Sequence, residues 1–281
     1  MSLLAYCDAD RTKSVLARDL ALHGTPEERA KRFFCQSPAC HARMAFRAAA
    51  EVPGGGCACF FALPSAPHTE NCSYSHLTAY DPDKHDEKSF DFKNFICYLE
   101  QEQKALTQQT AGCGNGTQSK KPLTTLQQVH GMLKNHAPKE WLGGRTVSSM
   151  LLDDRSFDEY YAHFNGSHIV EAIVNEGWSF AEGRPAPEGV QLNALEKRER
   201  LQYYSKLYLT LRVKGRSIIF SVYFNDTKLF EKMRKQITGG KVDYKAFDKP
   251  FVVVAGNWEL VPGTNHHYIT IVKNRKQIFC F

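Results

Sequence analysis

The most constraining feature of this 281-residue sequence is an alternation of apolar and polar side chains on both sides of one tight turn. Residues 201–213 form one such strand-like run, residues 218–224 alternate again, and Lys214-Gly215-Arg216 lies between them. In the first run the two parities are Leu207, Leu209, Leu211 and Val213 on one side and Lys206, Tyr208, Thr210 and Arg212 on the other. Because a period of two places neighbouring side chains on opposite faces of a strand, the pattern predicts two half-buried strands joined as a hairpin.

Further segments extend this strand pattern before and after the hairpin. Residues 251–258 and 268–279 are apolar strand-forming runs, and Asp226 opens a helical segment that ends at Gly239-Gly240. Residues 168–174 are a candidate first strand, although their composition also fits a helix. Three strands, a helix and two strands are the chain order of the OB-fold, a small barrel whose second and third strands carry the binding face. The region resembles OB domains of nucleic-acid-binding proteins, so we expect a five-stranded OB-like β-barrel over residues 166–281.

The predicted barrel also holds most of the positive charge. From Asn193 onward there are 17 Lys and Arg against 7 Asp and Glu, whereas residues 1–192 hold 19 against 23. Such a split indicates that one half of the chain faces a polyanion. A solvated basic surface without a partner is the alternative interpretation.

Aromatic and basic side chains alternate on the outward parity of the predicted barrel and near its end. Sites for single strands combine cations along the phosphates with flat rings on which bases stack. The candidate nucleic-acid-binding residues are Tyr204, Lys206, Tyr208, Arg212, Lys214, Arg216, Tyr223, Trp258, Lys273, Arg275 and Lys276. An outward Tyr can instead merely cover the barrel, and Trp258 can instead pack in its core or rim. Taken together, the set predicts binding of single-stranded DNA or RNA.

The N-terminal region concentrates the cysteines, because residues 1–76 hold six of the nine. Two short-spaced pairs flank a predicted hairpin of residues 44–47 and 59–62. Zinc accepts thiolate and imidazole ligands, and such pairs on two turns are the usual way to supply them. We therefore expect a Zn²⁺ ion bound by Cys35, Cys40, His68 and Cys72. Cys57 is the first candidate to replace one of them, Cys59 and His41 are also close in sequence, and ordinary buried thiols are the alternative.

The order of these elements resembles the N-terminal zinc module of the CoiA-type competence proteins. The shared features are Phe34-Cys35, Cys40, a hairpin with Phe60-Phe61-Ala62, and Pro67-His68. The likeness covers about 40 residues, and the sequence departs from it in two spacings: four residues separate the first thiols, and His68 lies six residues beyond Ala62. The resemblance implies a metal-stabilised module that works near nucleic acid, and it implies no activity.

The middle region, residues 77–165, is polar with local helical periodicity. Residues 107–121 are Gly-rich and almost without apolar side chains, which is typical of a linker or long loop. A helix is expected after Pro122, and another after Ser156 as N-cap with Glu159 closing a capping box. Thr25-Pro26-Glu27-Glu28 opens a third helix in the same way. We therefore expect an α+β chain with a zinc-binding hairpin module over 1–76, a helical and linker region over 77–165, and the barrel over 166–281.

Composition narrows the location and the class of function. No apolar run approaches the roughly 18 residues of a membrane span, and the N-terminus lacks a signal-peptide pattern. We expect a cytoplasmic protein without a membrane role that binds nucleic acid and is not an enzyme. A metal-dependent nuclease is one alternative, for which Asp153-Asp154 and Asp158-Glu159 are the candidate acidic pairs. A protein-interaction module with an acidic partner is the other.

Overall fold

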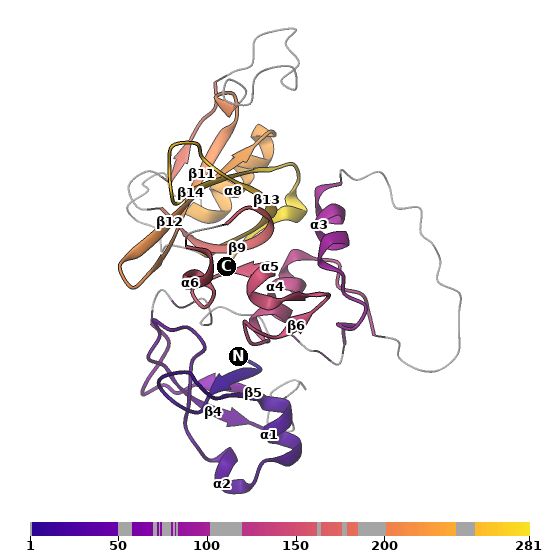
Figure 1. Cartoon of the computed structure of the whole chain (residues 1–281), viewed down its shortest axis with the longest axis vertical. Coiled ribbons are helices and arrows are strands. Elements are labelled where there is room, and N and C mark those ends of the chain that lie inside the picture. Colours follow the sequence, from indigo (N-terminus) through magenta and orange to yellow (C-terminus); the bar gives the residue numbers. More distant parts are fainter. Residues whose placement is uncertain are drawn as a thin grey trace, which may run out of the picture.

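The computed structural model arranges the chain as three parts, with an N-terminal sheet at one end, a barrel at the other and a helical layer between them (Figure 1). The residues that it describes are 2–49, 58–69, 72, 74, 80, 82, 84–101, 120–161, 164–175, 179–184, 201–239 and 251–281.

The N-terminal part is a five-stranded sheet of order β2-β1-β3-β4-β5. Its strands are β1 (Leu4–Tyr6), β2 (Ser14–Leu16), β3 (Phe33–Phe34), β4 (Arg43–Arg47) and β5 (Cys59–Ala62). Strands β4 and β5 are antiparallel, which confirms the predicted hairpin. Two short helices, α1 (Ala17–His23) and α2 (Pro26–Arg29), follow β2. Helix α2 begins with the predicted capping box of Thr25 and Glu28.

The C-terminal part is a closed five-stranded barrel. Its strands are β9 (Gly166–Val174), β11 (Ser205–Val213), β12 (Arg216–Phe224), β13 (Phe251–Leu260) and β14 (His267–Val272). They pair in the ring order β9-β11-β12-β14-β13, and β13 returns to β9. Within this ring β12 and β14 run parallel, and the other four pairs are antiparallel. Residues 168–174, ambiguous in the sequence, are therefore a strand.

The connections of the barrel follow from local sequence. Lys214 and Gly215 have φ values of 50° and 80°, the two positive φ values of the type I′ turn that suits a two-residue hairpin. Helix α8 (Thr227–Thr238) connects β12 to β13. The Asp226 side chain caps its first turn by accepting from the Lys228 amide, and Gly239 ends it in the left-handed conformation at φ 61°. Both ends of this helix lie where the sequence predicts them.

Three short strands extend the barrel sheet. They are β8 (Leu151–Leu152) beside β9, β10 (Phe180–Ala181) beside β11, and β15 (Ile278–Cys280) beside β13. A 3₁₀ turn, η4 (Arg275–Gln277), precedes β15.

The helical layer consists of α3 (Phe92–Glu100), α4 (Leu126–Lys134), α5 (Val147–Met150) and α6 (Phe157–Tyr160). A small hairpin of β6 (Trp141–Leu142) and β7 (Arg145–Thr146) precedes α5. Helix α4 is the helix expected after Pro122, and it begins three residues beyond Leu123, after a capping box of Thr125 and Gln128. None of the helices in the described residues is both long enough and apolar enough to cross a membrane.

Two apolar cores meet at the wall of the barrel. The inward parity of the strands, with Leu209, Phe220 and Trp258 among its members, fills the barrel together with Phe230 and Met233 of α8. The outward side chains Ile169 of β9 and Val253 of β13 instead join a second core with α3, α4 and α5. The helical layer therefore covers the outer face of β9 and β13.

Two details differ from the sequence-based expectations, and one region is not described. The strand expected to start at Leu201 starts at Ser205. The Ser156 side chain does not cap α6, because its hydroxyl donates to the Leu151 carbonyl at 2.9 Å and accepts from the Asp153 amide. Residues 107–119 of the predicted linker lie outside the described residues.

Candidate functional site

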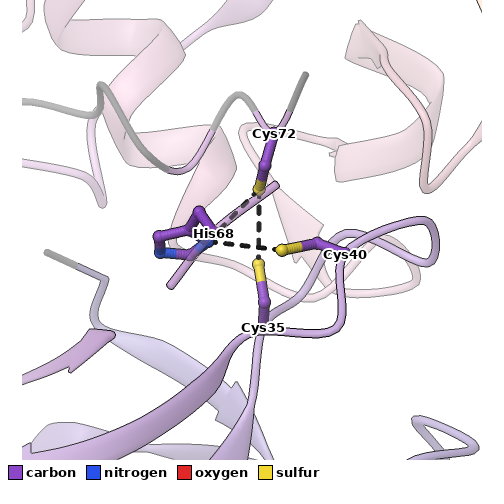
Figure 2. Close-up of side chains that lie close together, drawn as sticks. All are labelled: Cys35, Cys40, His68 and Cys72. Carbon is purple, nitrogen blue, oxygen red and sulfur yellow. Dashed lines mark hydrogen bonds between the residues drawn. The ribbon is translucent and has the colours of Figure 1, made fainter. Parts of the chain in front are cut away.

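Four side chains from two short segments converge beside the N-terminal sheet (Figure 2). Cys35 follows β3 and Cys40 precedes β4, whereas His68 and Cys72 come after β5. The Sγ atoms of Cys35 and Cys72 are 3.6 Å apart, and His68 Nδ1 lies 3.4 Å from Cys40 Sγ and 3.3 Å from Cys72 Sγ. All four ligand atoms lie within 4.8 Å of one another. This geometry could hold one metal ion.

The loop of residues 35–40 is fixed by hydrogen bonds around its backbone. The Cys40 amide donates to the Ser37 carbonyl at 3.1 Å, and the Cys35 amide donates to the Ala42 carbonyl at 3.2 Å. Arg11 spans the loop, because its Nε donates to the Cys35 carbonyl at 2.9 Å and its Nη2 to the Cys40 carbonyl at 2.6 Å. Such outer contacts orient the side chains that ligate a metal.

The thiols strongly perturb each other's protonation. A hydrogen bond shared with Cys35 holds the pKa of Cys40 well below its usual range, and contacts with Cys72 and His68 act in the same direction. That hydrogen bond raises the pKa of Cys35 to about 12, and hydrogen bonds with Cys35 and then Cys40 raise the pKa of Cys72. A thiolate surrounded by two further thiols and an imidazole is a set of donors that suits a soft or borderline cation.

The four ligands predicted from the sequence are therefore brought together. Of the alternatives, Cys59 is buried on β5 and His41 is exposed, and neither belongs to the group of four. Cys57 lies outside the described residues.

The outer face of β11 and β12 carries the aromatic and basic residues of the predicted interface. Lys206, Tyr208 and Arg212 alternate outward along β11, opposite Tyr223, Ser221 and Ser217 of β12. The Lys206 ammonium lies 5.2 Å from the centre of the Tyr223 ring. Burial lowers the pKa of Lys206 and raises the pKa values of Tyr208 and Tyr223. Lys206 and Tyr208 are half-buried, but Tyr223 is only 9 % exposed, so its predicted role as an exposed stacking ring is wrong.

Several other predicted interface residues lie elsewhere. Trp258 is 0 % exposed inside the barrel, where its Nε1 donates to the His168 carbonyl at 3.2 Å, so its assignment as a stacking surface is wrong. Tyr204 is 7 % exposed and offers little ring surface. Tyr204 was placed outward because strand parity was extended beyond Ser205, where β11 begins.

The basic turn after β14 lies beside α3, on the side of the barrel that the helical layer covers. Lys273 pairs with Glu100 at 3.0 Å, and the Lys276 ammonium lies 4.4 Å from the Tyr98 ring centre. Arg275 is exposed on the same turn. These three residues are thus separated from the face of β11 and β12.

The turn between β11 and β12 follows Val213, at the end of β11 remote from Lys206. Lys214 and Arg216 are exposed, and Arg216 contacts the Asp158 carboxylate and lies over the rings of Phe157 and Tyr161. Arg216 is therefore engaged with α6.

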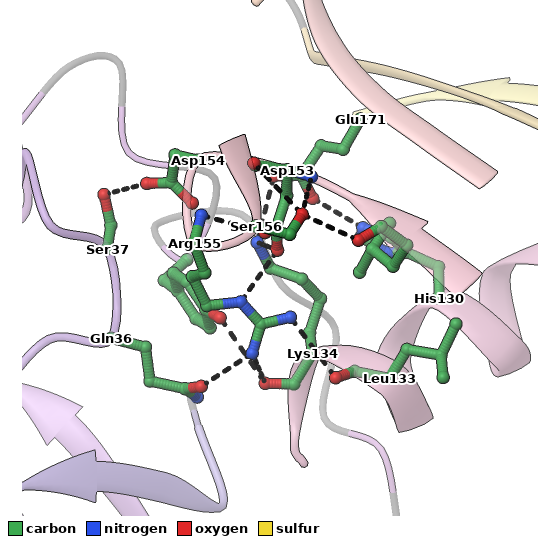
Figure 3. A network of polar contacts seen from close by, with 12 residues as sticks. Gln36, Ser37, His130, Leu133, Lys134, Asp153, Asp154, Arg155, Ser156 and Glu171 are labelled. Atoms are coloured by element: carbon green, nitrogen blue, oxygen red, sulfur yellow. Dashed lines mark hydrogen bonds and ion pairs between the residues drawn. The ribbon is translucent and has the colours of Figure 1, made fainter. Parts of the chain in front are cut away.

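A buried ionic network that the sequence did not predict lies where the three parts meet (Figure 3). The Lys134 ammonium at the end of α4 donates to Asp153 Oδ2 and to Glu171 Oε1, both at 3.0 Å, and it is 0 % exposed. Arg155 Nε donates to Asp153 Oδ2 at 2.8 Å. His130 Nε2 donates to Glu171 Oε2 at 2.5 Å.

This network also connects the loop of residues 35–40, which is the metal-binding loop of the candidate site, to the barrel. The Ser37 hydroxyl donates to Asp154 Oδ2, and Arg155 Nη1 donates to Gln36 Oε1 at 3.1 Å. The loop that carries Cys35 and Cys40 is thereby hydrogen-bonded to the turn after β8. The group of Cys35, Cys40, His68 and Cys72 and the barrel wall are consequently connected through one hydrogen-bonded network.

The network sets the charge of its members. Burial works against ionisation of Asp153, but Arg155 and Lys134 outweigh it and lower the pKa of this carboxyl. Burial raises the pKa of Asp154 to about 6, the Lys134 ammonium opposes this, and the Asp153 carboxylate adds to it. Burial also lowers the pKa of His130, which keeps its imidazole neutral near pH 7. Two cations thus face three carboxylates.

The nuclease alternative rested on two acidic pairs, and they have different environments. Asp158 and Glu159 are exposed on α6. Carboxylate oxygens of Asp153, Asp154 and Glu171 lie within 4.8 Å of one another. However, the side chains of Lys134 and Arg155 both donate to Oδ2 of Asp153, and the Arg155 backbone amide donates to its Oδ1, so both oxygens already have donors.

Two signals in the sequence point to this network. Glu171 is the single charged residue in the apolar strand 168–174, and His130 and Lys134 are four residues apart on a helix. A charge in a buried strand requires a partner, and residues i and i+4 share one helix face.

A cavity of about 380 Å³ lies between the metal-binding loop and the barrel. Ser37 and Ala39 line it from the loop, and Thr210 and Arg212 line it from β11. Asp154 and Glu171 bring carboxylates to it. It is therefore adjacent to the outer face of β11 and β12.

No protein-family model matches this sequence, and no significant match is found among curated proteins.

Proposed function

We propose that this chain binds single-stranded nucleic acid on the outer face of β11 and β12, beside a zinc-held N-terminal module. The observation that carries the proposal is the division of the barrel wall. The helical layer covers the outer face of β9 and β13, whereas on the outer face of β11 Arg212 is exposed and Lys206 and Tyr208 are half-buried.

The barrel topology supports an OB-type assignment. Numbered in chain order, its five strands pair as 1-2-3-5-4-1, strands three and five are parallel, and α8 lies between strands three and four. The OB-fold is a five-stranded Greek-key barrel with a binding face centred on its second and third strands. Those strands are β11 and β12 here, the same two that carry Lys206, Tyr208, Arg212 and Tyr223.

The cluster of Cys35, Cys40, His68 and Cys72 fits zinc. Tetrahedral bonds of about 2.3 Å to sulfur and about 2.05 Å to nitrogen imply S···S separations of about 3.8 Å and S···N separations of about 3.6 Å. The Cys35–Cys72 distance of 3.6 Å and the His68 Nδ1 distances of 3.3 Å and 3.4 Å are close to these values. When bound, zinc would hold the two halves of this module together, and we assign it a structural role.

The proposed contacts divide into stacking and charge. Tyr208 offers its half-buried ring to a base, and Lys206 over Tyr223 and Arg212 further along β11 offer cations to the phosphates. Stacking on an aromatic side chain contributes about 1–3 kcal/mol per base. Each phosphate contact steepens the salt dependence of the affinity.

Fluorescence anisotropy with labelled single- and double-stranded DNA and RNA at about 50 and 200 mM salt tests the proposal. Single strands are expected to bind more tightly than duplexes, with an affinity that falls as salt rises. Tyr208→Ala is expected to weaken binding about five- to 150-fold, the equivalent of about 1–3 kcal/mol. Tyr98→Ala on α3 is the matched control and should bind like the wild type. Equal binding by both variants would contradict the assigned face.

The same preparation tests the two alternatives. Incubation of labelled strands with Mg²⁺ is expected to leave them intact, because Lys134 and Arg155 already neutralise the buried carboxylates. Cleavage that is lost in Glu171→Gln would instead support the nuclease alternative. A protein-interaction role would be favoured if no oligonucleotide bound at either salt concentration.

A further inference from the structure

The cavity at the metal-binding loop continues the proposed strand-binding face. Thr210 and Arg212, which line it, belong to the same outward row of β11 as Lys206 and Tyr208. Ser37 and Ala39 of the metal-binding loop form its other wall. A strand that follows the row from Lys206 toward Arg212 therefore reaches the cavity next.

The charges of the lining discriminate between nucleotides within a strand and at its end. Arg212 is exposed and makes no ion pair with another described residue. Among the described residues that line the cavity, it is the one with a positively charged side chain. Asp154 and Glu171 also line the cavity, although both oxygens of Glu171 are hydrogen-bonded to Lys134 and His130. A nucleotide inside a strand brings two phosphodiesters, of which Arg212 can neutralise one while the described lining offers no second cation for the other. A terminal nucleotide brings one phosphodiester and a free hydroxyl.

Asp154 also offers an acceptor for that hydroxyl. Its Oδ2 accepts from Ser37, whereas its Oδ1 is buried and has no hydrogen-bond partner among the described residues. Figure 3 shows this second oxygen turned away from Ser37. A buried carboxylate oxygen without a donor is costly, and a hydroxyl that enters the cavity can satisfy it.

We propose that this cavity receives the terminal nucleotide of a bound single strand, with its phosphate at Arg212 and its free hydroxyl at Asp154. The volume of about 380 Å³ is near the lower end of the roughly 300–1,000 Å³ range of small-ligand sites, so it suits one nucleotide rather than several. This inference rests on the proposed function. The hydroxyl is common to the 3′ and the 5′ end, and the experiment distinguishes the two.

The test compares linear and circular forms of one single-stranded thymidine oligonucleotide of about 40 nucleotides, which is longer than the 4–16 nucleotides that an OB fold covers. The linear form is expected to bind about tenfold more tightly than the circle. Two further linear forms carry a phosphate on the 3′ or on the 5′ hydroxyl. Phosphorylation of the end that enters the cavity should reduce the affinity to that of the circle, and phosphorylation of the other end should not.

Variants separate the cavity from the rest of the face. Arg212→Gln, at an exposed position that should not disturb folding, is expected to abolish the preference for the linear form. Arg275→Gln, an exposed arginine beside α3, should retain it. Tyr208→Ala should weaken binding of the linear and circular forms by the same factor, because it lies on the face and not in the cavity.

Each result supports or overturns the assignment of the cavity to the terminal nucleotide. Equal affinity of the wild type for the linear and circular forms would overturn the terminal assignment and leave the proposed function standing. A preference for linear strands that persists in Arg212→Gln would overturn the cavity as its cause. If neither form binds, the proposed function and the terminal assignment both fall.

Discussion

Replacement of Lys134 by methionine tests the buried network most directly. The methionine side chain approximates the volume of the lysine stem but removes the ammonium, which makes 3.0 Å hydrogen bonds to Asp153 and Glu171. The Lys134 ammonium also lies 4.2 Å from the centre of the Tyr74 ring. Asp153 keeps Arg155 and Glu171 keeps His130 as partners, but the compensation of charge is lost.

The expected loss is large because none of the groups is solvated. Lys134 is 0 % exposed, Asp153 1 % and Glu171 2 %. Breaking a buried ion pair by removing one partner costs about 3–5 kcal/mol, since it leaves a buried charge without compensation. The stability of Lys134→Met should therefore fall by about 3–5 kcal/mol. Replacing Glu171 by methionine as well should recover part of that loss, because the uncompensated carboxylate is then removed.

Urea unfolding followed by intrinsic fluorescence, with zinc present throughout, measures these differences. Lys273→Met is the matched control, because Lys273 also pairs with a carboxylate at 3.0 Å but is 47 % exposed in its side chain. An exposed pair contributes about 0–1 kcal/mol, so the control should remain close to the wild type. The reasoning would be refuted if the two methionine variants lost equal stability, or if the double variant were less stable than Lys134→Met alone.

Three further predictions concern other parts of the molecule. Cys72→Ala should lose the bound zinc measured by elemental analysis and lower the melting temperature, whereas Cys97→Ala, at an exposed position on α3, should retain the metal. Burial opposes protonation of His136, but hydrogen bonds to Glu140 and Glu87 outweigh it and raise its pKa to about 9. The stability of the wild type relative to His136→Gln should therefore be full below about pH 6.5 and disappear as the pH rises to about 9, as urea midpoints across that range would show. Gly215→Val should destabilise the β11–β12 hairpin by about 1–3 kcal/mol, because a β-branched residue is strained at φ 80°, and an unchanged urea midpoint would contradict this.

The sequence predicted the elements whose signals are local. Alternation along residues 205–224 is a property of neighbouring side chains. The hairpin, and the set of its side chains that point inward, could therefore be predicted from the sequence alone. The same holds for Asp226 and Gly239, because helix caps are recognised over a few residues. The four side chains of the candidate metal site could be predicted from the sequence because their pairs are close in sequence and flank one hairpin.

The remaining features depend on contacts between distant segments. Lys134, Asp153 and Glu171 come from a helix, a turn and a strand, and nothing in their spacing encodes their meeting. Trp258 was assigned to the surface because β13 has apolar side chains on both of its faces, so alternation gives no indication of which side faces inward. Lys276 lies apart from the binding face because η4 packs on α3, a helix whose position no local pattern specifies.

The shared wall of the barrel affects how the protein can be divided. A fragment beginning at Gly166 would retain all five strands of the ring, yet it would expose Ile169, Val253 and Phe279 to water and leave Glu171 without Lys134. Such an apolar surface favours self-association. Isolating the barrel as a monomer would therefore require polar substitutions on the outer side of β9 and β13. The strands that face the proposed ligand, β11 and β12, would need no substitution.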